Sequence, residues 1–135
     1  MKPAKGKSVT VMVADDNDDV RRLFALQLRA LGYQIVEAAN GEEALEFAQQ
    51  STPSLILINI HLPVLDGLAA TRAIRNIEQL RNTAIVAYSS YPSIFTRERA
   101  LAAGANEYVT RRECVDQLAR IVRLFTNRSG EMFMR

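Results

Sequence analysis

The stretch Leu55–Gly67 reads LILINIHLPVLDG. Its first residues are branched and apolar, a pattern typical of a strand covered on both faces. Pro63 and the pair Asp66 and Gly67 then indicate a turn. Asn59 interrupts the apolar run at the point where a carboxylate would be expected if this turn took part in phosphate chemistry. The stretch therefore predicts a buried strand and leaves open whether Asn59 is an ordinary polar residue or has replaced a reactive one.

Length and composition predict one ordinary globular domain. The chain has 135 residues, of which 48% are hydrophobic and 24% charged, enough to bury roughly two thirds of the unfolded surface. We expect a flexible basic segment at residues 1–7, a domain at 8–126 and a tail at 127–135. The start lacks an apolar signal core, and no apolar run approaches the ~20 residues of a membrane span, so we expect a cytoplasmic protein. The single Cys114 predicts a small buried side chain.

Charge is unevenly spread although the net charge is only +2. Residues 8–81 carry ten acids against six Arg, whereas residues 82–135 carry eight Arg against five acids. A basic C-terminal part could bind an acidic partner, or it could simply be a set of solvated helix faces.

Strand-like and helix-like segments alternate along the whole chain. Strands are expected at residues 9–14, 33–38, 55–60, 84–89 and 107–110. Helices are expected at residues 20–31, 42–50, 68–80 and 93–103, and a last one carries Leu118, Ile121, Val122 and Phe125. The first helix should bury Val20, Leu23, Phe24, Gln27, Leu28 and Leu31 and end at Gly32. This alternation predicts an α/β fold, a parallel sheet with helices on both faces and right-handed crossovers.

Polar side chains follow four of these strands. In parallel sheets, ligands bind outside the carboxyl ends of the strands. The residues at those ends are Asp15 and Asp16, Asn59, Ser89 with Ser90, and Arg111. We therefore expect these groups to lie close together at one edge of the sheet.

This ordered set, with HLPVLDG after the third strand, resembles the receiver domain of response regulators over about residues 8–125. The resemblance implies a flavodoxin-like (βα)5 fold, a doubly wound five-stranded parallel sheet of order 2-1-3-4-5. In that family three carboxylates hold Mg²⁺, one of them is phosphorylated by a histidine kinase, and a hydroxyl, an aromatic residue and a Lys respond to the phosphoryl group. The family is a signalling module and not an enzyme.

The family roles map onto this chain as follows. Asp15 and Asp16 match the acid pair, and Asn59 matches the phosphoacceptor. The backbone carbonyl of His61 matches a further metal ligand. The switch positions match Ser89, Tyr108 and Arg111.

The sequence departs from the family at three positions near the chemistry. Asn59 replaces the acceptor Asp, and because an amide nitrogen is not nucleophilic, no acyl phosphate can form there. Arg111 replaces Lys with a planar fork that suits bidentate carboxylate pairing, and Arg112 stands where Pro is usual. We expect weak Mg²⁺ binding at most and no required cofactor.

Each assignment has an ordinary alternative. The acid pair could only begin a helix, and Tyr108 could only pack at the sheet edge. Arg111 could pair with Asp15 or Asp16, or it could reflect a general preference for Arg. Either Ser89 or Ser90 could face the site, and the side chain of His61 is expected in solvent.

We therefore expect a receiver-like protein that has lost phosphotransfer and signals by protein contacts, as a monomer or weak homodimer. The partner, a histidine kinase or an effector, should bind the face of helix four, strand five and helix five. The basic residues expected there are Arg97, Arg99, Arg112, Arg120 and Arg123. Membrane and nucleic-acid binding are not expected, since no recognition helix is present. The alternatives are an ordinary receiver whose acceptor was changed to Asn in the laboratory, and a flavodoxin-like cofactor enzyme, which the acidic ADDNDD loop disfavours.

Overall fold

The computed structural model describes residues 9–91 and 93–127. Its five strands are β1 (Thr10–Ala14), β2 (Gln34–Ala38), β3 (Leu55–Asn59), β4 (Ala84–Ser89) and β5 (Glu107–Thr110). Its helices are α1 (Asp18–Ala30), α2 (Gly41–Ser51), α3 (Gly67–Arg75), α4 (Thr96–Ala103), α5 (Arg111–Asp116) and α6 (Leu118–Thr126), with a 3₁₀ turn η1 (Glu78–Leu80). The segment at residues 1–7 and the tail beyond Asn127 lie outside the described residues.

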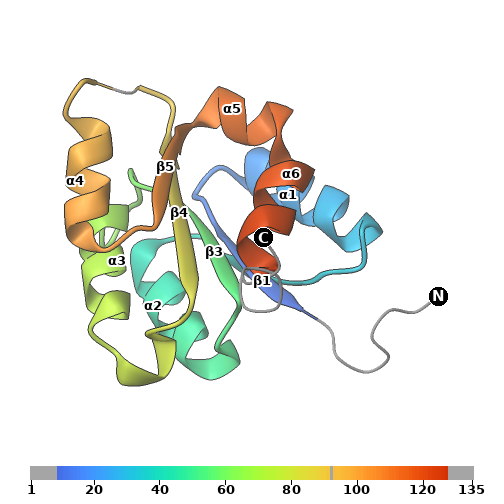
Figure 1. Cartoon of the computed structure of the whole chain (residues 1–135), viewed down its shortest axis with the longest axis horizontal. Helices are drawn as coiled ribbons and strands as arrows, with labels where there is room; N and C mark the ends of the chain where they lie inside the picture. Colours follow the sequence, from blue (N-terminus) through green and yellow to red (C-terminus); the bar gives the residue numbers. More distant parts are fainter. Residues whose placement is uncertain (1–8, 92, 128–135) are drawn as a thin grey trace.

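All strand pairs are parallel, and the sheet order is β2-β1-β3-β4-β5. Figure 1 shows α1, α5 and α6 on one side of the sheet and α2, α3 and α4 on the other. The doubly wound architecture of order 2-1-3-4-5 is therefore confirmed. Within the described part of the chain, no helix is long and apolar enough to cross a membrane.

Two buried clusters hold the layers together. One lies between the sheet and α2, α3 and α4 and includes Met12, Ile56, Ile58 and Ile85. The other lies under α1 and α6 and includes Phe24, Leu57 and Val122. Every residue of β3 and β4 is buried, as expected for central strands covered on both faces.

The buried face of α1 differs from the predicted one. Leu23 and Leu31 are 43% and 52% exposed, and Gln27 is exposed as well. Arg21 and Ala25 are buried in their place. The reason is that the Arg21 guanidinium bonds to the backbone oxygen of Asp15 at 2.9 Å and to the carboxylates of Asp18 and Glu37. An Arg that bonds to two carboxylates and a backbone oxygen can be buried on a helix face for which periodicity considers only apolar side chains.

Three helix boundaries also differ from the prediction. The third helix ends at Arg75, and η1 follows as a separate turn. The fourth begins at Thr96 and not at Ser93, although Gly104 ends it as expected, with φ 117°. The last helix consists of α5 and α6, because Thr110 and Glu113 form a reciprocal capping box that starts a helix directly after β5.

Gly67 lets α3 begin close against the end of β3. A Cβ atom at this position would lie 2.2 Å from the backbone oxygen of Asn59. The Gly67 N–H donates to the oxygen of Ile60 at 2.9 Å, and Asp66 caps the helix by accepting from Leu68 and Ala69. The Asp-Gly pair of the opening stretch thus fixes the backbone that carries Asn59.

Candidate functional site at the carboxyl ends of the strands

The strand register brings the predicted site residues to one edge of the sheet. Ala14 pairs with Ile58, so Asp15 and Asn59 follow at neighbouring strand ends. Asn59 pairs with Tyr88, and Ser89 pairs with Thr110, which directly precedes Arg111. The residues that sequence analysis placed at four strand ends therefore lie side by side across β1, β3, β4 and β5.

Asn59 is the last residue of β3 and is only 7% exposed. Its Oδ1 accepts a hydrogen bond from the backbone N–H of His61 at 2.9 Å. Because that partner is a donor, the bonded atom must be the amide oxygen, and the remaining group of the side chain is the Nδ2 donor. Asn59 thus turns its acceptor toward its own loop and offers the site neither a nucleophile nor a free oxygen.

The two acids of the pair have different environments. Asp15 is completely buried, and its Oδ1 accepts from the backbone N–H of Asn17 at 2.9 Å. Its Oδ2 accepts from the Tyr88 hydroxyl at 2.5 Å, the length of a charge-assisted O–H···O⁻ bond. Asp16 is exposed and forms no hydrogen bond or ion pair with the described residues. Only one of the two carboxylates is therefore free.

Tyr88 is a site residue that sequence analysis missed. Burial raises the pKa of its phenol well above 10, and the charge and hydrogen bond of Asp15 raise it further, whereas Arg111 acts in the opposite direction. Its ring packs edge-on against Phe24, with centroids 5.9 Å apart. The signal was a Tyr inside an otherwise aliphatic buried strand, since a buried phenol needs a hydrogen-bond partner.

Ser89 and Tyr108 bond to each other. The Oγ of Ser89 and the hydroxyl of Tyr108 are 2.7 Å apart, Ser89 is completely buried, and Tyr108 is 8% exposed. Ser90 is exposed, so of the two candidate hydroxyls only Ser89 lies inside the fold. Tyr108 faces inward and does more than pack at the sheet edge.

Arg111 is the first residue of α5 and is half-buried. The ion pairs among the described residues join it to neither Asp15 nor Asp16. Its Nε is buried and has no hydrogen-bond partner in the part of the chain that the structure describes. Of the two interpretations of Arg111, the structure thus does not support pairing with the acid pair.

The side chains at this edge do not supply the ligands that a tightly bound divalent cation needs. Hard cations such as Mg²⁺ need oxygen ligands, yet Asp15 is buried and bonded, and the one side-chain oxygen of Asn59 accepts the His61 N–H. Across residues 9–91 and 93–127, no three side chains of His, Cys, Asp or Glu gather closely enough to hold a metal ion. Of the predicted ligands, the exposed carboxylate of Asp16 and the backbone carbonyl of His61 remain.

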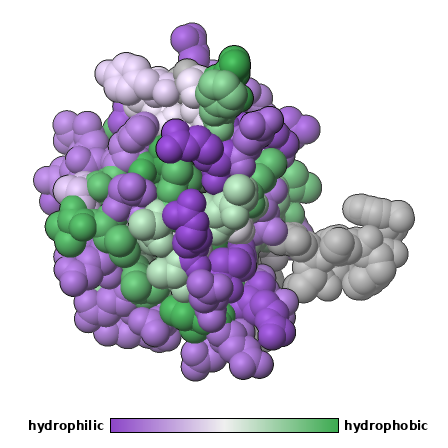
Figure 2. Space-filling model, turned by 90° about the vertical axis from the view of Figure 1, so that its left-hand side faces the viewer, coloured by the Kyte–Doolittle hydropathy of each residue, from purple (hydrophilic) through white to green (hydrophobic). Residues whose placement is uncertain are grey.

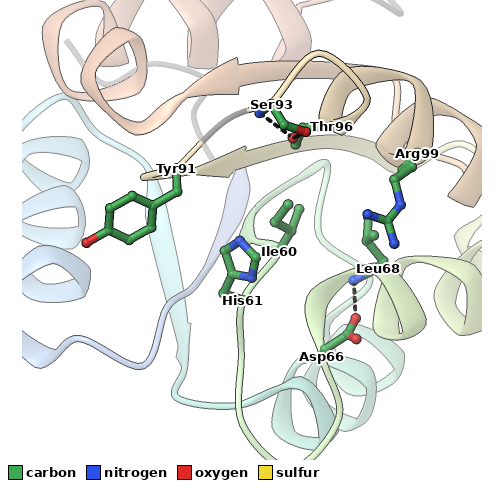
Figure 3. Close-up of a pocket in the computed structure, with 8 residues that line it drawn as sticks. All are labelled: Ile60, His61, Asp66, Leu68, Tyr91, Ser93, Thr96 and Arg99. Atoms are coloured by element: carbon green, nitrogen blue, oxygen red, sulfur yellow. Dashed lines mark hydrogen bonds between the residues drawn. The ribbon is translucent and has the colours of Figure 1, made fainter.

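A pocket of about 260 Å³ lies beside this site, between the β3–α3 loop and the start of α4. Its described lining is Ile60, His61, Asp66, Leu68, Tyr91, Ser93, Thr96 and Arg99. Figure 3 shows the His61 ring near Tyr91 at one end and Arg99 at the other, while Asp66 bonds to the backbone of Leu68. The lining includes neither acid of the pair, and His61 is exposed as expected.

Comparison with known proteins supports the resemblance. The sequence matches the response regulator receiver domain over residues 11–123. It is 31% identical over 102 residues to the polar-differentiation response regulator DivK of Brucella anthropi, which corresponds to 76% of this chain and 83% of DivK.

Two solved structures are also similar. The receiver domain of the sensor histidine kinase PA1611 from Pseudomonas aeruginosa, with magnesium in its active-site cleft, is 32% identical, with a TM-score of 0.80 and coverage of 89% of this chain and 98% of that one. The receiver domain of Ssk1 from Saccharomyces cerevisiae, solved with the phosphotransfer protein Ypd1, shares the fold at 24% identity, a TM-score of 0.83 and coverage of 91% and 92%. Since the family match runs from the first strand to the last helix, it favours a receiver over a flavodoxin-like enzyme. The chain belongs to the response regulator receiver domains, the signalling modules of two-component systems.

Proposed function

We propose that this receiver domain signals without being phosphorylated at the usual position and acts through protein contacts. The observation that carries the proposal is the Asn59 amide, whose oxygen accepts the His61 N–H. Neighbouring Ile58 and Ile60 supply no other nucleophile, and an amide cannot form an acyl phosphate.

The bond between Ser89 and Tyr108 supports the same proposal. In the family the hydroxyl binds a phosphoryl oxygen and the aromatic residue reports the change. Here the two hydroxyls share one hydrogen bond at 2.7 Å inside the fold, so each has a protein partner without a phosphoryl group. We infer that one arrangement of the switch residues is held without phosphate, and that the partner recognises that arrangement.

We propose the face of α4, β5 and the helices after it as the partner surface. Residues 96–123 carry six Arg against four acids, and the side chains of Arg97 and Arg112 are 56% and 88% exposed. Arg99, Arg120 and Arg123 are exposed too. Arg97 forms an ion pair with Glu107, and the Nε of Arg112 lies 3.9 Å from the Oδ2 of Asp116. Part of the positive charge of this face is therefore already neutralised.

Apolar side chains at the start of α4 add to this surface. Ile94 is 83% exposed and Phe95 is 59% exposed. Figure 2 looks at the α3 and α4 side and shows hydrophobic atoms at its top, the edge where Figure 1 places the β4–α4 connection. Exposed apolar groups beside Arg suit an acidic, amphipathic surface of a cytoplasmic kinase or effector.

The experiment is affinity capture with the immobilised protein from a lysate of the source organism, with and without acetyl phosphate. We expect the same partners in both conditions and their loss from a Phe95→Asp variant, while an Arg22→Asp variant on exposed α1 retains them. Capture that requires acetyl phosphate would contradict the proposal. Capture that survives Phe95→Asp would place the partner on another face.

A further inference from the structure

Asp15 is a buried carboxylate that forms no ion pair with any cationic side chain of the described residues. Arg21 reaches its backbone oxygen and not its carboxylate, and Arg111 pairs with neither acid. A buried charge without compensating hydrogen bonds is strongly unfavourable. The groups that meet this charge are the Asn17 N–H and the Tyr88 hydroxyl.

We propose that the Tyr88 hydroxyl takes the place of a metal ion at Asp15, so that the acid pair is stabilised from within the fold. This inference rests on the proposed function, in which the site works without phosphate. It adds a second cause of weak Mg²⁺ binding, located on β4 next to Asn59 in the sheet.

The geometry at Asp15 supports a hydrogen-bond donor in the place of a cation. Asp15 has no exposed surface, so a hydrated ion can reach its Oδ2 only by displacing the phenol. The phenol cannot swing away freely, since Tyr88 is completely buried and its ring packs against Phe24. Tyr88 also lies directly opposite Asn59 in the sheet register, so its hydroxyl and the Asn59 amide close the same site from adjacent strands.

The deciding measurement is the Mg²⁺ affinity of Tyr88→Phe by calorimetric titration. Phe keeps the ring and removes only the donor. A bound cation then stabilises the Asp15 carboxylate in place of the lost hydrogen bond. We expect about tenfold tighter Mg²⁺ binding than in the parent. Tyr108→Phe is the matched control: it also removes a buried hydroxyl from a hydrogen bond, but not one that touches Asp15, and its Mg²⁺ affinity should equal that of the parent.

The same substitution in an Asn59→Asp background makes the test sharper. The carboxylate at position 59 then joins Asp15 and Asp16 around one ion, so Tyr88→Phe should increase affinity by a larger factor than it does beside Asn59. Equal Mg²⁺ affinity of the parent and Tyr88→Phe, or an equal gain in Tyr108→Phe, would overturn the proposal. If Tyr88→Phe is unfolded without metal, folding on addition of Mg²⁺ supports the proposal and failure to fold at any Mg²⁺ concentration contradicts it. Phosphorylation is not read in these titrations, so they can fail while the proposed function stands.

Discussion

The side-chain oxygen of Asn59 accepts the backbone N–H of His61, 2.9 Å away and two residues further along the chain. This bond occupies the only oxygen of the side chain. Asp at position 59 could accept the same N–H with one oxygen and still present the other. Asn in place of Asp therefore lacks the second carboxylate oxygen but keeps the bond that holds the local turn.

Restoring the carboxylate should make stability depend on metal. In Asn59→Asp without Mg²⁺, a third carboxylate lies beside Asp15 and Asp16, and repulsion should lower the free energy of unfolding by about 1 to 3 kcal/mol at an effective dielectric of about 20. Urea unfolding with and without Mg²⁺ measures this. We expect Mg²⁺ to recover the loss in Asn59→Asp and to change the parent little. Equal stability of the two proteins without metal would show that the acids do not interact.

The contribution of Arg111 can be separated by a double-mutant cycle. Since its guanidinium pairs with neither acid, we expect the effects of Asn59→Asp and Arg111→Lys on Mg²⁺ affinity to add within about 0.5 kcal/mol. Titration of the four proteins gives the interaction energy. A gain in the double variant well beyond the sum would indicate that Arg111 does pair with the acid pair in solution.

Arg75 should be a main stabilising residue of the α3 and α4 layer. Its guanidinium donates to the backbone oxygens of Gly104 and Thr83 and to Asn106 Oδ1, at 2.9 to 3.1 Å. Arg75→Lys cannot make this set of bonds and should lower the free energy of unfolding by about 2 kcal/mol or more. Arg72→Lys, on the exposed side of the same helix, should change it by less than about 0.5 kcal/mol. Similar losses in both variants would argue against this role.

Val64 should be a strained position. Its φ is +70°, a left-handed conformation that is unusual for a β-branched residue, and its side chain is 74% exposed. Val64→Gly removes a backbone strain of about 1 to 2 kcal/mol. Part of this gain, about 0.5 to 1 kcal/mol, is offset because Gly increases the conformational entropy of the unfolded chain. We expect a net gain in thermal unfolding stability. Val64→Ala keeps the strain and serves as the control, and destabilisation by Gly would contradict the assignment.

Stability should fall at alkaline pH partly through Cys114. Burial, and then the charge of Asp15, raise the pKa of this thiol from 9.0 to about 12. As pH rises, the thiol loses its proton in the unfolded state before it does so in the folded state. The contribution of the buried thiol to the free energy of unfolding is therefore fully present below pH 9 and is lost as pH rises toward 12. Urea unfolding at pH 8 to 10.5 should show a shallower decline for Cys114→Ala than for the parent. Parallel declines would mean that the thiol does not contribute.

The sequence predicted the sheet and its strand ends because both follow from local patterns. Runs of branched residues define β3 and β4, and parallel topology then places Asp15, Asn59 and Ser89 together. The hydrogen bonds of the site were not predictable in the same way. Tyr88 meets Asp15 across 73 residues of chain, and no local spacing encodes that pairing. The burial of Arg21 was not predictable for a similar reason, since it depends in part on Glu37 of β2, 16 residues further along the chain. The helix start after β5, by contrast, could have been predicted from Thr110 and Glu113, which have the spacing of a capping box.

The proposed function depends most on the inability of Asn59 to accept a phosphoryl group. The direct test is intact-mass measurement of the parent and of Asn59→Asp after incubation with acetyl phosphate and Mg²⁺. We predict no acid-labile phosphoryl adduct on the parent, and on Asn59→Asp a partial adduct that maps to residue 59. A stoichiometric, acid-labile phosphoryl adduct on the parent protein would contradict the account.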